Sequence, residues 1–135
     1  MPDSIVAQLP ITTLLAAYLA SLLVWLALRT IALRRANKVS IGTGDISTLA
    51  RASRGHANLA EYGPFAILLC GLAEWQGAQR WWLVPTVLAF AAGRAMHAYS
   101  FTRSKQEFTW RMAGMHMTLW PLMGLIVIAL GSLVR

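Results

Sequence analysis

Residues 9–33 read LPITTLLAAYLASLLVWLALRTIAL, an apolar run whose one charged residue, Arg29, lies near the far end. A helix needs about 20 mostly apolar residues to cross a hydrocarbon core roughly 30 Å thick. This run is long enough, and the side chain of Arg29 can reach the interface while its stem stays in lipid. The segment therefore predicts a transmembrane helix.

Three more segments of similar length follow, at about 46–74, 81–102 and 111–133. They are long and lack the period-two alternation of a transmembrane β-strand, so we expect helices and not a barrel. Of the 135 residues, 57% are hydrophobic and only 13% are charged, which is too apolar for an ordinary soluble domain. The sequence predicts an all-α fold, a single four-helix integral membrane bundle over residues 1–135.

Lysine and arginine gather in two of the three connections between these segments. The start, Met1-Pro2-Asp3, lacks the basic region of a secretory signal, so the first helix is expected to be retained. Because basic loops stay in the cytoplasm, both termini are predicted to lie outside, in a multi-pass topology. The cations that carry this prediction are Arg34, Arg35, Lys38, Arg51, Arg54, Arg103, Lys105 and Arg111.

Composition excludes several functional classes. The net charge of +7 sits at segment ends and forms no soluble basic face, so nucleic acid is not an expected partner. Cys70 is the single cysteine, so neither an intrachain disulfide nor a Cys/His metal cluster is expected. The Gly42-Thr43-Gly44 sequence follows no strand and lacks the third glycine of a dinucleotide fingerprint.

The second segment begins with polar residues that are unusual in a membrane span. Arg54, Asn58 and Glu61 recur at helical spacing and are expected on one face, which we call the polar stripe. A charged side chain in a span costs a few kcal/mol on insertion scales, so such residues usually face the bundle interior and find partners. We therefore expect Glu61 to meet a partner on another helix.

Candidate partners lie on the third and fourth segments. Arg94, His97 and Phe101 share a helical face, and Arg111 opens the fourth segment. In the predicted topology these groups and the polar stripe meet at the cytoplasmic side and form one site. Three arginines against one glutamate leave a surplus of positive charge that an anionic ligand would neutralise. The alternative is an interhelical polar network that fixes packing and binds no ligand.

The pattern Arg54-x-x-x-Asn58-x-x-Glu61-Tyr62-x-Pro64 resembles the second-helix signature of the MAPEG family, the membrane-associated proteins in eicosanoid and glutathione metabolism. Arg94-x-x-His97 and Arg111 also resemble family positions, and the chain is most similar to the bacterial, YecN-like branch of inner-membrane proteins. The resemblance implies a homotrimer in the bilayer, with glutathione as cosubstrate at each subunit interface.

The same resemblance implies roles for individual residues. Arg111 would be the catalytic residue that stabilises the thiolate of glutathione, whose attack on a lipophilic small molecule would make the protein a transferase or peroxidase. No metal site is implied. The residues implied to bind glutathione are Arg54, Asn58, Glu61, Tyr62, Arg94 and His97.

One position departs from the family pattern. Phe101 stands where members commonly have a tyrosine that contacts glutathione near its sulfur, and phenylalanine donates no hydrogen bond. Tyr99 lies two residues away and is expected to face a different direction on a regular helix. A non-enzymatic membrane protein, in which the polar cluster serves trimer assembly or binds a lipid headgroup, therefore remains the alternative.

Overall fold

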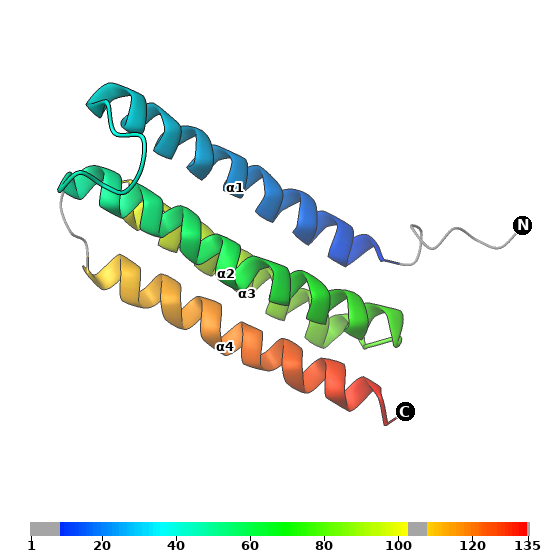
Figure 1. The fold of residues 1–135 in the computed structure, drawn as a ribbon. Coiled ribbons are helices and arrows are strands. Elements are labelled where there is room, and N and C mark those ends of the chain that lie inside the picture. Colours follow the sequence, from blue (N-terminus) through cyan, green and yellow to red (C-terminus); the bar gives the residue numbers. More distant parts are fainter. Residues whose placement is uncertain (1–8, 103–107, 135) are drawn as a thin grey trace, which may run out of the picture.

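The structure, a computed structural model, describes residues 9–102 and 108–134. Four long helices run alternately in opposite directions, so the start of the first and the end of the last lie at the same end of the bundle (Figure 1). The predicted all-α fold is thereby confirmed. The helices are α1 (Pro10–Asn37), α2 (Ser47–Trp75), α3 (Arg80–Ser100) and α4 (Phe108–Ser132).

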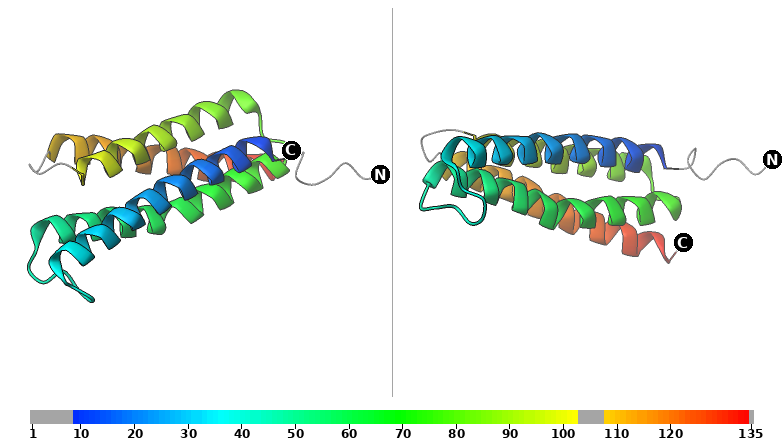
Figure 2. Two further views of the ribbon diagram at one scale, coloured as in Figure 1. Left: turned by 90° about the horizontal axis from the view of Figure 1, so that it is seen from above. Right: turned by 45° about the horizontal axis from the view of Figure 1, so that its top comes forward.

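The two central helices, α2 and α3, pack against each other and against both outer helices. The outer helices, α1 and α4, lie on opposite sides of this pair (Figure 1), and Figure 2 shows the bundle from two further directions. By length and composition, α1 and α4 are apolar enough to cross a membrane. The most apolar helices thus occupy the positions with the most outward-facing surface, as expected where the surroundings are lipid.

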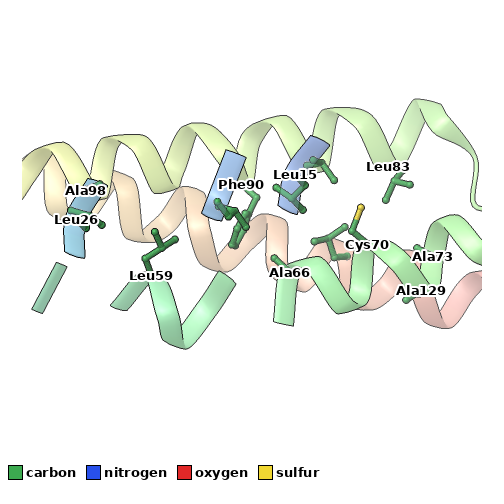
Figure 3. Packing of buried hydrophobic residues seen from close by; sticks show 13 residues of the cluster. Leu15, Leu26, Leu59, Ala66, Cys70, Ala73, Leu83, Phe90, Ala98 and Ala129 are labelled. Carbon is green, nitrogen blue, oxygen red and sulfur yellow. The ribbon is translucent and has the colours of Figure 1, made fainter. Parts of the chain in front are cut away.

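Buried apolar side chains fill the interior along the length of the bundle (Figure 3). Phe90 of α3 is fully buried near the middle, and Leu26 of α1 is only 1% exposed. Cys70 of α2 is also fully buried and packs among these side chains. This core holds α2 and α3 in register and so fixes where their polar residues lie.

A carboxylate from α2 caps the start of α1. The first turn of α1 has no capping side chain of its own, because the preceding residue is Leu9. Glu74 accepts hydrogen bonds from the backbone N–H groups of Ile11 (3.0 Å) and Thr12 (2.9 Å) and from the Thr12 hydroxyl (2.8 Å). An anion is stabilised at a helix N-terminus, where unpaired N–H groups point outwards. Glu74 therefore joins the end of α2 to the start of α1.

The ends of two helices differ from the sequence prediction. The first helix was expected to end near residue 33, but α1 continues to Asn37 and ends where Lys38 adopts a left-handed conformation. The apolar run indicates only the part of the helix that would lie in the hydrocarbon core, whereas α1 continues beyond it. Arg34 and Arg35 lie in the last turn, where positive charge interacts favourably with the helix dipole. Likewise α4 begins at Phe108, ahead of the predicted residue 111.

Candidate functional site

The polar stripe of α2 divides between the outer surface and the interior. Arg54 and Glu61 are exposed, whereas Asn58 is only 8% exposed and Tyr62 is half-buried. Seven residues complete nearly two turns, so Arg54 and Glu61 share a face, while Asn58 lies about 40° around the helix from Arg54. The stripe therefore presents two opposite charges outwards and one amide inwards. The Asn58 side-chain oxygen has no hydrogen-bond partner among the described residues.

Arg94 of α3 is fully buried between the helices. Its Nη1 donates to the Thr118 hydroxyl of α4 at 3.2 Å, and its Nη2 lies 3.5 Å from Nδ1 of His97. Thr118 in turn donates to the backbone carbonyl of Gly114 at 2.8 Å, so the contact is tied to the α4 backbone. The Nε atom of Arg94 is buried and has no partner in the described part of the chain. The guanidinium thus lies inside the helix bundle, in contact with a hydroxyl and an imidazole and with no carboxylate among the described residues.

Phe101 lies where three helices meet at the end of α3. Its ring is 5.0 Å from the His97 ring in an edge-on arrangement, and the guanidinium carbon of Arg111 is 5.1 Å from the Phe101 ring centroid. On α2, a Cβ added at Gly55 would lie 3.1 Å from Cβ of Phe101. The phenyl ring therefore brings α2, His97 and Arg111 together, and the aromatic–cation contact helps to position Arg111.

The site has more positive than negative charge. Arg54, Arg94 and Arg111 lie on the three helices that meet here, and Glu61 is the carboxylate of the polar stripe. Within residues 9–102 and 108–134, none of these arginines forms an ion pair with Glu61. The expectation that Glu61 meets a partner on another helix of the same chain is therefore wrong for the described residues. A charge without a partner in the described part of its chain remains open to a ligand or to another copy.

Comparison with known proteins tests the family resemblance noted in the sequence. The model of the MAPEG family matches residues 12–131, most of the chain. The chain belongs to the MAPEG family. It is 36% identical over 119 residues, 88% of each chain, to the inner membrane protein YecN of Escherichia coli K12 and to the protein of the same name in E. coli O6:H1 strain CFT073. The predicted family and its YecN-like branch are thereby confirmed, and the chain is a membrane protein.

Several residues that shape the site of this MAPEG protein did not stand out in its sequence. Thr118 is an ordinary threonine until the helix packing places its hydroxyl against Arg94. Gly93 and Gly114 allow α3 and α4 to approach closely, because an added Cβ would lie 2.5 Å from the Met117 carbonyl oxygen and 2.8 Å from the His97 nitrogen. A threonine hydroxyl within a helix commonly donates to the backbone carbonyl four residues earlier, so the sequence gives no sign that Thr118 also contacts a distant arginine.

Replacing Thr118 with valine is expected to destabilise the protein by about 2 kcal/mol, because it leaves a buried guanidinium donor unpaired. Thr30→Val is the matched control, since Thr30 makes the same backbone hydrogen bond within its helix but no contact with a charge. In an Arg94→Met background the cost of Thr118→Val should fall to that of the control. Unfolding in detergent is measured for the wild type and for the four variants, the Arg94→Met single variant included. An equal cost for Thr118→Val and Thr30→Val would contradict the assigned contact.

Proposed function

We propose that this MAPEG protein binds glutathione, or a similar anionic thiol, at the polar stripe. The observation that carries the proposal is that Arg54 and Glu61 lie exposed on one face of α2 with no ion pair among the described residues. Exposed charges are costly in a membrane domain, so a ligand or partner that meets both signs is strongly favoured. Glutathione carries two carboxylates and one ammonium group, which match an arginine-rich site containing one glutamate.

The individual roles follow from the family resemblance and from where each side chain lies. Glu61 would pair with the α-amino group of glutathione and Arg54 with a carboxylate. Asn58 and Tyr62, which are buried and half-buried, would close the inner side of the site. The guanidinium of Arg94 and the ring of His97 lie deeper in the subunit and would supply positive potential and hydrogen bonds from behind.

A second part of the proposal is that three copies assemble in the inner membrane, with all four helices crossing it. The exposed face of α2 would then be covered by a neighbouring subunit, which explains why it carries charge. A shallow groove of about 210 Å³ between α1 and α2 is lined on both helices by small residues, among them Ala16, Ala20, Ala60 and Gly63. Small residues allow close approach of a helix from another subunit.

The proposed reaction is transfer or peroxide reduction. A nearby guanidinium favours the thiolate form of glutathione, and the thiolate is the nucleophile. In transfer, the thiolate sulfur forms a bond to an electrophilic carbon of a lipophilic substrate. Either a leaving group departs from that carbon with its bonding electrons, or a double bond at that carbon opens and its electron pair moves to a neighbouring atom, which takes up a proton. In peroxide reduction, the thiolate sulfur attacks the terminal oxygen of the hydroperoxide and breaks the O–O bond, which leaves glutathione sulfenic acid and releases an alkoxide that is protonated to the alcohol. The thiol of a second glutathione then attacks this sulfur, and the hydroxyl departs as water to leave the disulfide.

The second candidate, a non-enzymatic protein that uses the stripe for assembly or lipid-headgroup binding, is favoured by one observation. Phe101 occupies the junction of Gly55, His97 and Arg111, is only 5% exposed and carries no hydroxyl that could contact a thiolate. Such a protein would keep its oligomeric state and stability in the presence or absence of glutathione. Binding and turnover measurements separate the two candidates.

Glutathione at millimolar concentration is expected to raise the unfolding temperature of the purified protein in detergent, and Glu61→Gln should remove most of this increase. A ligand that binds only the folded state stabilises it in proportion to the logarithm of its concentration above Kd. Asp45→Asn is the matched control, because Asp45 is an exposed carboxylate in the loop before α2 and lies outside the stripe. An unchanged unfolding temperature for the wild-type protein would overturn the binding proposal.

A further inference from the structure

The ring of Phe101 is fixed by two helices. Phe101 follows the last residue of α3, and only 5% of it is exposed. Its ring meets the His97 ring edge-on, with the two ring planes at 68°. On α2, Gly55 leaves room for the ring, because a Cβ added at Gly55 would lie 3.1 Å from Cβ and 3.2 Å from Cγ of Phe101. The place of the ring is therefore set by the backbone of α2 and by the imidazole of α3.

The Arg111 guanidinium lies over this ring and has no other partner in the described part of the chain. Its central carbon is 5.1 Å from the Phe101 ring centroid, and within residues 9–102 and 108–134 it makes no hydrogen bond or ion pair. A cation is attracted to the electron-rich face of an aromatic ring, more strongly where water is partly excluded. Arg111 is half-buried, so this attraction counts.

Contact with a ring face differs from the way other arginines of the bundle are held. Arg29 donates from Nη2 to the backbone carbonyl of Thr102 at 2.8 Å, and Arg94 donates from Nη1 to the Thr118 hydroxyl. Those contacts use N–H donors, whereas a ring face beneath the guanidinium uses none that lie in its plane. Arg111 is thus oriented while its donors stay available for an anion, and hydrogen bonds from a charged donor to an anion are strong.

We propose that Phe101 is a positioning residue for thiol activation, because its ring holds the Arg111 guanidinium ready to donate to the sulfur of glutathione. Gly55 is the residue that lets the ring lie there. The inference rests on the proposed function, since it requires glutathione at the polar stripe. The ring acts on the arginine and not on the sulfur, so it needs no hydroxyl. A fixed cation also stabilises the thiolate without reorganising first.

Other charged or titratable side chains surround the same end of the bundle. They are unchanged in every variant below that alters Phe101 or Gly55, so a difference between those variants reports on the ring. These side chains are Arg29 of α1, Arg51, Arg54, His56, Glu61 and Tyr62 of α2, Arg94, His97 and Tyr99 of α3, and His116 of α4.

The experiment uses the purified full chain in detergent and follows the thiolate of bound glutathione by its ultraviolet absorbance as the pH is varied. In Phe101→Leu the pKa of this thiol should rise by about one unit, and at a pH below that pKa kcat should fall about tenfold. KM should change less than about twofold, because the binding groups remain. The loss is smaller than in Arg111→Ala, since the cation stays in the site. Phe101→Tyr keeps the ring and should keep at least wild-type turnover.

Two matched controls separate this role from packing. Phe90→Leu makes the same exchange at a fully buried phenyl ring in the core of α3, and it should destabilise the protein without changing the thiol pKa. Gly55→Ala should shift the ring and change the thiol pKa in the direction of Phe101→Leu. Gly71→Ala on the same helix should leave it unchanged, because the nearest atom to its added Cβ is Cγ2 of Thr12 at an ordinary 3.5 Å.

Four results would overturn the inference while glutathione still binds. These are an unchanged thiol pKa in Phe101→Leu, an equal change in Phe90→Leu, Phe101→Tyr behaving like Phe101→Leu, or equal effects of the two glycine exchanges. If Phe101→Leu does not fold, the glycine pair decides.

Unfolding without glutathione tests the ring contact itself. Phe101→Leu should cost less stability in an Arg111→Ala background than in the wild type, and equal costs would overturn the contact. Failure of the proposed function is recognised separately. The wild-type protein would then show no glutathione-dependent rise in unfolding temperature and no bound thiolate, and this inference would fall with it, whatever the result of the unfolding cycle.

Discussion

Gly93→Ala is expected to destabilise the protein by about 3 kcal/mol, the largest effect of any glycine-to-alanine exchange in the described chain. The added Cβ would lie 2.5 Å from the carbonyl oxygen and 2.6 Å from the carbonyl carbon of Met117. These are backbone atoms, so relief requires α3 and α4 to move apart and not merely a side chain to rotate. The unfolding temperature in detergent should therefore fall by several degrees.

Gly131→Ala provides the matched control on α4, because nothing lies within 4 Å of its added Cβ. Alanine is a better helix former than glycine, so this exchange should be neutral or slightly stabilising. Gly114→Ala meets the backbone of His97 at 2.8 Å across the same contact and should resemble Gly93→Ala. The double variant should cost less than the sum of the two, because one separation of the helices relieves both clashes. Wild-type stability in Gly93→Ala would show that the helices do not approach as closely as described.

The four helices could be predicted because each segment is long and lacks the period-two alternation of a strand, and α1 and α4 are also apolar over the length that a membrane crossing requires. Residues 9–33 are sufficient to identify the first helix. The last turn of α1 could not be predicted in this way, since Arg34 and Arg35 lie beyond the apolar run but continue the helix. Nor could the cap of α1, because Glu74 is 62 residues from Thr12 in sequence and its role depends on how α2 packs.

The site was predicted in its composition but not in its internal geometry. Helical spacing placed Arg54, Asn58 and Glu61 near one face, and the separation of Asn58 from the other two follows from which side of α2 the neighbouring helices cover. Spacing along a helix gives angular positions, whereas burial depends on the neighbouring helices. The contact of Arg94 with Thr118 depends on the register between α3 and α4, which the close glycine contacts set. Register between helices is not visible in the periodicity of either one.

Arg111→Ala is expected to reduce glutathione-dependent turnover about 100-fold or more, the loss typical when a group that stabilises developing charge is removed. Arg111 is half-buried near the start of α4, with its guanidinium held over the Phe101 ring. Without Arg111, the thiol of bound glutathione should ionise less readily. At a pH below the pKa of this thiol, a rise of one unit in that pKa reduces the thiolate fraction about tenfold. Turnover is measured as kcat/KM with a generic electrophile and with a hydroperoxide.

The dependence on pH separates thiol activation from a purely structural role. If Arg111 acts by favouring the thiolate, the deficit of Arg111→Ala should shrink as the pH rises, because hydroxide then removes the proton unaided. Arg111→Lys keeps the charge, so its turnover should lie between that of the wild type and that of Arg111→Ala. Arg80→Ala removes an exposed arginine from the first turn of α3 and should leave turnover unchanged. Equal losses in Arg111→Ala and Arg80→Ala, or no wild-type turnover across a broad panel, would exclude the proposed catalysis. In that case, a glutathione-dependent rise in unfolding temperature that Glu61→Gln removes would indicate a protein that binds glutathione but does not catalyse its reaction. Phe101 is consistent with this outcome, because it has no hydroxyl that could activate the thiol in place of Arg111.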